Sequence, residues 1–167
     1  MSVKKSYNFF LLNPYDNNFY FITDNYIVYE IEFKPSNYLF ESIEPIATET
    51  FELSISIYSK PPFQKSEFDP ITGQTIFLIF EDFYNRNHLT VTVHICDTSD
   101  GREFARMRKF NYWFEQFNTE IYFKSDIILF SKDGESAPTS IILRRDNPYR
   151  HQIIEAFEKL TDGYNQK

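Results

Sequence analysis

Two segments in the first third of the chain alternate apolar and polar residues with a period of two. In residues 26–34 the apolar positions are Ile27, Tyr29, Ile31 and Phe33. In residues 50–59 they are Phe51, Leu53, Ile55 and Ile57. A strand that buries only one of its faces has this pattern, because successive side chains point to opposite faces. The alternation argues against helices here and predicts an antiparallel sheet with one solvated face.

Similar patterns divide the rest of the chain into strands and helices. Strands are expected at residues 6–12, 19–23, 26–34, 50–59, 88–96, 125–132 and 139–145. Helices are expected at residues 70–86, 102–117 and 147–163. Asp69-Pro70 and Asn147-Pro148 supply helix-start signals, and Gly163 supplies a stop signal. Residues 125–132 are apolar on both faces, which predicts a central strand.

The expected order is ββββ-α-β-α-ββ-α. It predicts an α+β fold: a mostly antiparallel sheet of six to seven strands with three helices packed on it. Residues 1–167 show no linker or internal repeat, so we expect a single globular domain.

Composition excludes several classes of protein. The single cysteine excludes an intramolecular disulfide framework and a Cys-rich zinc module. With 4 glycines, the chain has no G-x-x-x-x-G-K-[ST], G-x-G-x-x-G or G-x-S-x-G motif, and it lacks the Gly-rich pyrophosphate turn of an acyltransferase. No apolar run fits a membrane span or a secretory signal. We therefore expect a cytoplasmic protein with no cofactor, no metal and no membrane partner.

Aromatic residues are abundant: 19 Phe, 12 Tyr and 1 Trp. A low-GC coding sequence and an aromatic binding surface both explain this excess. Most of the Phe residues fall on the apolar rows of the expected elements, so they are predicted to form the core. The exceptions are Phe63 and Phe68 in a Pro-containing loop, and Trp113, which are expected to lie outside the core.

The most informative segment begins where the strand at residues 88–96 ends. It reads C-D-x-x-D-G-R-x-x-x-R-x-x-x-F-x-x-W-F, from Cys96 to Phe114. It resembles the signature of an uncharacterised bacterial family of unknown function, for which no activity is established. The resemblance is confined to about twenty residues. It implies membership of that family and no particular chemistry.

The residues of this motif suggest a binding site at a strand-to-helix turn. Asp100 suits a helix start, and Gly101 permits a tight chain reversal. Along the following helix, one face carries Arg102, Arg106, Lys109 and Trp113. The candidate binding residues are therefore Asp97, Asp100, Arg102, Arg106, Lys109 and Trp113.

Three interpretations of this segment are open. In the first, Asp97 and Asp100 form ion pairs with Arg102 and Arg106 and only lock the turn. In the second, the arginines and Trp113 anchor a partner or an anionic ligand, since Arg and Trp are enriched in hot spots. In the third, the two aspartates act as metal ligands or as acid and base groups.

Two other groups of residues deserve a functional test. His94 and Cys96 share one strand face, but a nucleophilic pair also needs an orienting third group, which the sequence does not supply. Basic residues near aromatic ones suggest nucleic-acid binding. They are Arg102, Arg106, Arg108, Lys109, Arg144, Arg145 and Arg150. The net charge of −7 argues against a nucleic-acid partner. Nucleic-acid binding stays an alternative only through such a local basic patch.

The sequence thus favours binding over catalysis. We expect an interaction protein that binds a protein partner, such as an antitoxin, immunity or defence-accessory component. One alternative is an enzyme acting on a nucleotide or nucleic acid through Asp97, Asp100 and Arg102. The other is a sensor of a small anionic ligand through Arg102, Arg106 and Trp113.

Overall fold

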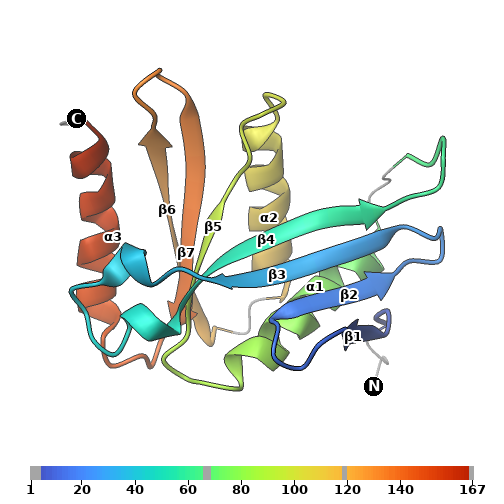
Figure 1. Cartoon of the computed structure of the whole chain (residues 1–167), viewed down its shortest axis with the longest axis horizontal. Coiled ribbons are helices and arrows are strands. Elements are labelled where there is room, and N and C mark those ends of the chain that lie inside the picture. Colours follow the sequence, from blue (N-terminus) through green and yellow to red (C-terminus); the bar gives the residue numbers. More distant parts are fainter. Residues whose placement is uncertain (1–4, 66–68, 118–119, 166–167) are drawn as a thin grey trace.

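The computed structural model describes residues 5–65, 69–117 and 120–165. Its centre is a seven-stranded sheet in the order β1-β2-β3-β4-β5-β7-β6 (Figure 1). The strands are β1 (Phe9–Leu11), β2 (Asn18–Ile22), β3 (Val28–Pro35), β4 (Thr50–Ser59), β5 (Val91–Ile95), β6 (Tyr122–Phe130) and β7 (Ser136–Arg144). The helices are α1 (Pro70–Tyr84), α2 (Glu103–Phe117) and α3 (Arg150–Asn165), with short 3₁₀ turns η1 (Asn37–Phe40) and η2 (Ala47–Glu49).

The element order and the fold class agree with the sequence prediction. The first four strands form an antiparallel meander, and β5, β7 and β6 are also joined in antiparallel pairs. The junction between these two groups is different, because β4 and β5 run parallel. The sheet is therefore mixed and mostly antiparallel.

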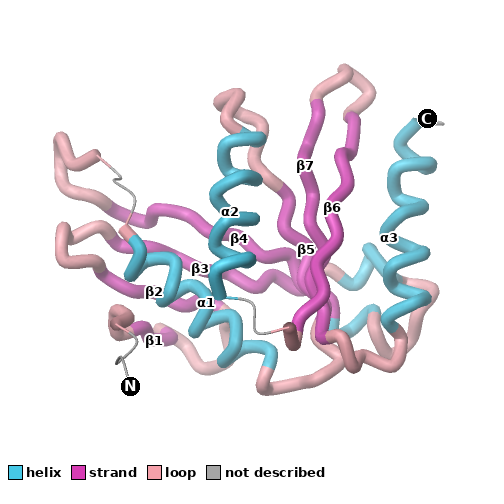
Figure 2. The backbone as a smooth tube through the Cα atoms, turned by 180° about the vertical axis from the view of Figure 1, so that it is seen from behind, coloured by secondary structure: helices cyan, strands magenta, loops and turns pink. Residues whose placement is uncertain are grey.

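Helices cover the two halves of the sheet unequally. α1 and α2 lie on the same face, as Figures 1 and 2 show from opposite sides. Ile31, Leu53 and Ile142 point to this face and share a core cluster with residues of both helices. On the opposite face, α3 and the 3₁₀ turns cover β5, β7 and β6 in a second cluster. No described helix covers that opposite face over β1–β4, which is the solvated face expected from the alternation.

The start of α1 follows its sequence signals. The Asp69 side chain accepts a hydrogen bond from the Ile71 N–H at 2.9 Å, and Pro70 occupies the first helical position. Tyr7 fixes this cap from the N-terminal segment, since its hydroxyl donates to the Asp69 carboxylate at 2.5 Å. Asp69 thus satisfies the N–H groups of Ile71, through its side chain, and Thr72, through its carbonyl.

Several expectations need correction. β6 is an edge strand, and β7 is the central strand of that hairpin. β6 is apolar on both faces because one side packs under α3, while Ile128 and Phe130 remain about half exposed. α3 continues two residues past Gly163 to Asn165, because its hydrogen-bonded backbone runs through the glycine. Within the described ranges, no helix combines the length and the apolar character needed to cross a membrane.

The three aromatic residues expected outside the core have different outcomes. Phe63 is fully exposed, as predicted, and Phe68 lies outside the described residues. Trp113 is buried, with 9% of its surface exposed, so the prediction that it lies outside the core is wrong. It is buried because α1 passes directly beside it at Gly73.

Candidate functional site: a cleft where the sheet forks

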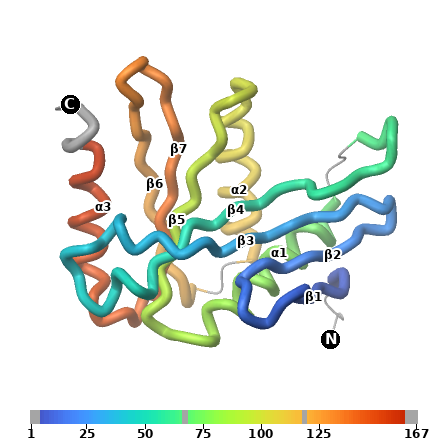
Figure 3. The backbone as a smooth tube through the Cα atoms, in the orientation of Figure 1, coloured from blue at the N-terminus to red at the C-terminus, as the bar shows by residue number. Residues whose placement is uncertain are grey.

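β4 and β5 pair over three residues and then separate. The ladder joins Thr50, Phe51 and Glu52 to Val91, Thr92 and Val93. Beyond it the two strands diverge in a V, as Figure 3 shows. Each strand keeps its other neighbour, β3 or β7, along this stretch. The fork therefore opens two strand edges toward each other inside a single sheet.

The pattern of hydrogen bonds identifies which backbone groups face the fork. In a strand, the N–H and C=O of one residue point to the same side, and the side alternates along the chain. The Thr50 carbonyl bonds toward Ser36 on the β3 side, so Leu53, Ile55 and Ile57 direct their backbone groups toward β5. The Cys96 N–H bonds to Pro138 on the β7 side, so Ile95 faces β4. No described strand pairs with the Ile55, Ile57 and Ile95 edges.

His94 sits at the apex of the fork. A continuing ladder would join the Leu53 carbonyl to the Ile95 N–H. Instead the His94 ring takes that carbonyl, with Nδ1 at 2.9 Å from the oxygen. Because a carbonyl only accepts, Nδ1 carries the proton. Burial lowers the pKa of His94, so the ring is neutral near pH 7. Its hydrogen bond to Leu53 takes the place of the next backbone bond, and the ladder ends there.

The space between the separated strands is a cavity of about 590 Å³. One wall is β4 from Glu52 to Ile57, the second is the end of β5 with the turn after it, from His94 to Asp97, and α2 closes the back. The lining also includes Arg102, directly before α2, and the α2 residues Ala105, Arg106, Lys109, Phe110 and Trp113. This volume lies within the range of about 300–1,000 Å³ typical of ligand sites. Apolar side chains with a few charged groups make up its lining.

The structure brings most of the predicted site residues together. Asp97, Arg102, Arg106, Lys109 and Trp113 all line this cavity. Asp100 does not line it, but its carboxylate holds Arg106 with bonds of 2.7 and 2.6 Å to the two terminal nitrogens. The shared helix face predicted from the spacing is therefore the face that α2 turns to the fork.

The turn before α2 is locked by its own side chains. Gly101 adopts a φ of +70°, a left-handed conformation that glycine allows at the chain reversal expected here. Asp97 accepts from the Ser99 N–H and hydroxyl, which lowers the pKa of its carboxyl. Arg106 lowers the pKa of the Asp100 carboxyl and also donates to the Asp97 carbonyl at 2.8 Å. The first interpretation of the motif therefore describes Asp100 and Arg106 correctly.

Arg102 and Lys109 are the cations that remain available to a ligand. Among the described residues neither side chain forms an ion pair. The Lys109 ammonium lies 4.8 Å from the centre of the Trp113 ring, a cation–π distance. Burial lowers the pKa of Lys109. An anionic group of a ligand placed between these two side chains would stabilise the charged form of the partly buried Lys109 ammonium.

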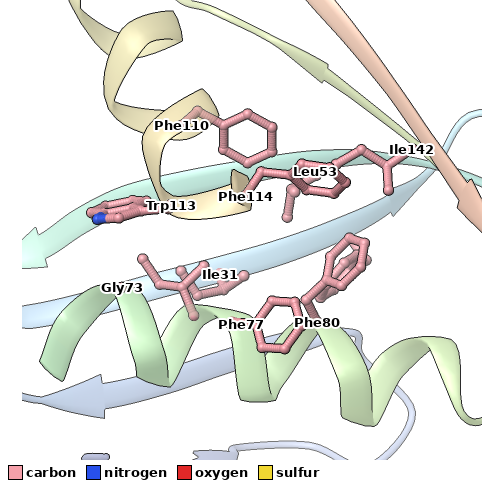
Figure 4. Close-up of a pocket in the computed structure, with 11 residues that line it drawn as sticks. Ile31, Leu53, Gly73, Phe77, Phe80, Phe110, Trp113, Phe114 and Ile142 are labelled. Carbon is pink, nitrogen blue, oxygen red and sulfur yellow. The ribbon is translucent and has the colours of Figure 1, made fainter. Parts of the chain in front are cut away.

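Trp113 joins the cleft to the core beneath it. It also lines a second, apolar cavity of about 30 Å³ between α1, α2 and the sheet (Figure 4). A Cβ on Gly73 would lie 2.8 Å from Trp113 Cδ1 and Nε1, so only glycine allows this close approach. The indole Nε1 is buried and has no hydrogen-bond partner among the described residues. This nitrogen lies on the side of the ring that faces Gly73 and the apolar cavity, so it is a buried donor of the core.

The groups considered for catalysis are engaged in structural contacts. The Cys96 thiol is buried, and burial raises its pKa to about 11. The His94 ring bonds to Leu53 rather than to Cys96, and its centre lies 4.4 Å from that of the Phe110 ring. In the part of the chain that the structure describes, no three His, Cys, Asp or Glu side chains gather as a metal site would require.

The second group of basic residues lies away from the cleft. Arg144 is held by the Asp146 carboxylate at 2.9 and 3.0 Å, and Arg150 lies over the Phe123 ring at 5.2 Å. Because Trp113 is buried, it offers no open ring face to a nucleic-acid base.

Sequence reasoning missed the contribution of β4. Leu53, Ile55 and Ile57 were expected only as core residues, yet they form one wall of the cavity. The available signal was topological: a strand that leaves a meander and returns through a helix lies parallel to its neighbour. Periodicity does not predict the residue at which β4 and β5 separate.

The fold and the site define a class of protein: an α+β domain whose sheet forks and holds a ligand-sized cavity at the fork. The chain belongs to a family of unknown function, DUF6169, whose model matches residues 69–159 and so includes the whole motif. No curated protein sequence matches it. The solved structure of a CoA-dependent acyl-homoserine lactone synthase, MesI, is similar at 14% identity and a TM-score of 0.37. That alignment covers 92% of this chain and 73% of the synthase.

Proposed function

We propose that this protein is a non-catalytic binding module whose cleft takes an extended, acidic segment of a protein partner. The observation that carries the proposal is the fork itself, where the unpaired edges of β4 and β5 face each other across one cavity. An extended peptide satisfies such edges by adding as a strand, with side-chain pockets supplying selectivity.

The charges in the cavity favour an acidic segment. Arg106 is already paired with Asp100, and the Asp97 carboxylate accepts hydrogen bonds from Ser99 within its own turn. Glu52 lies at the solvated rim of β4, opposite Lys34 of β3. Arg102 and Lys109 remain, and a carboxylate of the bound segment would pair with them. The apolar wall of Ile55 and Ile57 would receive alternate side chains of the same segment.

The engaged state of the polar groups supports binding rather than turnover. Asp97 and Asp100 are held ionised by hydrogen bonds that a proton-transfer role would have to break. The Cys96 thiol, with its raised pKa, is a poor nucleophile near neutral pH. We assign these groups to holding the fork and the turn in shape.

A small anionic molecule is the second candidate occupant. The observation that favours it is the cavity volume of about 590 Å³, which a small ligand could fill by itself. In that case the protein would act as a sensor through Arg102 and Trp113, with Arg106 holding the turn.

The test is selection from a displayed library of random eight-residue peptides. We expect enrichment of peptides with acidic residues between β-forming ones, each shifting the emission of Trp113, the single tryptophan. Arg102→Glu should weaken the selected peptides by about tenfold or more, as loss of a charge pair does. Ala105→Phe, which fills the cavity, should also weaken them. Arg108→Glu, on the same helix and outside the cavity, is the matched control.

Two results would overturn the proposal. One is enrichment of peptides that bind wild type, Arg102→Glu and Ala105→Phe equally. The other is no enrichment while small dicarboxylates or phosphate esters shift Trp113 emission in an Arg102-dependent manner. The second result would establish the small-ligand sensor instead.

A further inference from the structure

The solvated face of β1–β4 carries an aromatic row on the side of the sheet away from α1 and α2. Cross-strand register places Phe10 of β1 opposite Tyr20 of β2, and Tyr20 opposite Glu30 of β3. Tyr58 of β4 joins the row through the irregular register beside Val28. We call Phe10, Tyr20, Glu30 and Tyr58 the aromatic row.

The rings of the row pack on one another and remain open to solvent at both ends. Phe10 stacks on Tyr20 at 6.2 Å, and Tyr58 meets Tyr20 edge to face at 5.7 Å. Tyr20 is thereby covered, while Phe10 is 45% and Tyr58 68% exposed. Two exposed ring faces therefore flank a common centre.

A carboxylate occupies that centre. The Tyr20 hydroxyl donates to Glu30 Oε1, and Asn18 Nδ2 lies 3.5 Å from the same oxygen. These contacts orient Glu30 and leave its other oxygen without a partner among the described residues. Glu32 lies one row further along β3, opposite Asn18 and Ser54, and adds a second negative charge. The face thus combines exposed π surfaces with fixed negative charge.

We propose that the aromatic row is a docking site for an arginine side chain of a basic protein segment. A guanidinium can stack on an aromatic face while it donates to a carboxylate, and it does so better than an ammonium. Charge complementarity selects this occupant, because a chain of net charge −7 presents here two glutamates within the row and beside it. The row lies on the opposite face from α2, and none of its four residues lines the cleft, although the cleft residue Ser56 lies opposite Glu30.

The test is an NMR titration with the peptide acetyl-Arg-Gly-Arg-Gly-Arg-amide. We expect saturable shifts confined to the amides of the aromatic row and its strand neighbours, with tighter binding than the equivalent lysine peptide. Tyr58→Ala and Glu30→Gln should each weaken binding about two- to fivefold, the effect of one exposed cation–π or ion-pair contact. Tyr38→Ala and Glu41→Gln, at and beside η1, are matched controls that should bind like wild type.

Three outcomes would overturn the proposal. Shifts spread evenly over acidic residues would indicate nonspecific charge attraction. Wild-type affinity in both Tyr58→Ala and Glu30→Gln would remove the row from the site. Concentration-dependent self-association that Tyr58→Ala abolishes would make a second copy of this chain the occupant. Cleft variants such as Arg102→Glu should leave the titration unchanged.

Discussion

The two halves of the β4–β5 junction differ in backbone pairing: the strands are hydrogen-bonded to each other in one half and separated in the other. In the closed half, Thr50–Glu52 and Val91–Val93 form a parallel ladder between two core clusters, and Thr50 and Val91 are fully buried. In the open half, the same two strands part at His94 and leave their edges facing a cavity. The comparison teaches that one end of the junction is packed into the core, while the other end is open and is where we propose that a partner binds. Substitutions should therefore act differently on its two sides.

The largest expected difference is between Leu53 and Ile57, which lie on the same face of β4. Leu53 is 3% exposed at the end of the ladder, and Ile57 is 40% exposed in the open half. Leu53→Ala should lower the free energy of unfolding by about 2–5 kcal/mol through lost burial and a cavity. Ile57→Ala should cost less than about 1 kcal/mol. Chemical denaturation of the two variants measures the contrast, and equal losses would contradict it.

Gly73→Ala should give the next largest effect. The added Cβ overlaps Trp113, so the indole must shift, and overpacking of this kind costs about 1–3 kcal/mol. Part of this is offset because alanine favours the helix by up to about 1 kcal/mol. We expect a net loss of stability and a changed Trp113 emission. A more stable variant with unchanged emission would show that α1 and Trp113 are not in close contact.

A smaller effect concerns pH. Burial lowers the pKa of His94, and Lys124 acts in the same direction. As the pH falls, His94 is therefore protonated in the unfolded chain before it is protonated in the folded one. Stability is therefore full above the unfolded pKa of about 6.5 and declines as the pH falls below it. The contribution cannot exceed about 1.4 kcal/mol per pH unit.

His94→Asn keeps a donor for the Leu53 carbonyl but removes this titration. Its stability should therefore fall less than that of wild type between pH 7 and pH 5, as followed by urea unfolding. His151→Asn, at an exposed position on α3, should retain the wild-type profile. Identical profiles for wild type and His94→Asn would place the ring in a solvated environment.

The smallest expected effect comes from Asp100→Asn. The pair that it breaks is solvent-exposed, so the stability of the fold should change little. Because Arg106 would then be released to the cleft, acidic peptides selected on the wild type should bind somewhat more tightly. Weaker binding in titrations monitored by Trp113 would mean that Asp100 positions the wall instead of neutralising it.

Local signals predicted most of the elements. Residues 50–59 were expected as a strand and form β4 with those bounds, since alternation and the flanking prolines leave little choice. The α2 face was also predictable, because helical spacing alone aligns Arg102, Arg106 and Trp113. These features depend on patterns within a single strand or helix.

The fork and the burial of Trp113 depend on residues far apart in sequence. The ladder ends where His94 reaches Leu53, 41 positions earlier, and alternation carries no record of such a contact. Trp113 is buried because Gly73 leaves room on another helix. β6 was expected to be central because both of its faces carry apolar residues, but it is an edge strand whose apolar residues Phe123 and Ile127 pack in the cluster with α3. Long-range packing decided these outcomes against local preference.

Amide hydrogen exchange along β4 tests the forked sheet most directly. Ser54 and Ser56 direct their N–H groups to β3, while Ile55 and Ile57 direct theirs into the open half. We predict alternating protection, with slow exchange at the two serines and fast exchange at the two isoleucines, and slow exchange at Phe51 in the closed half. Equal protection at Ile55, Ile57, Ser54 and Ser56 would mean that the β4 edge is paired and that the cleft is closed.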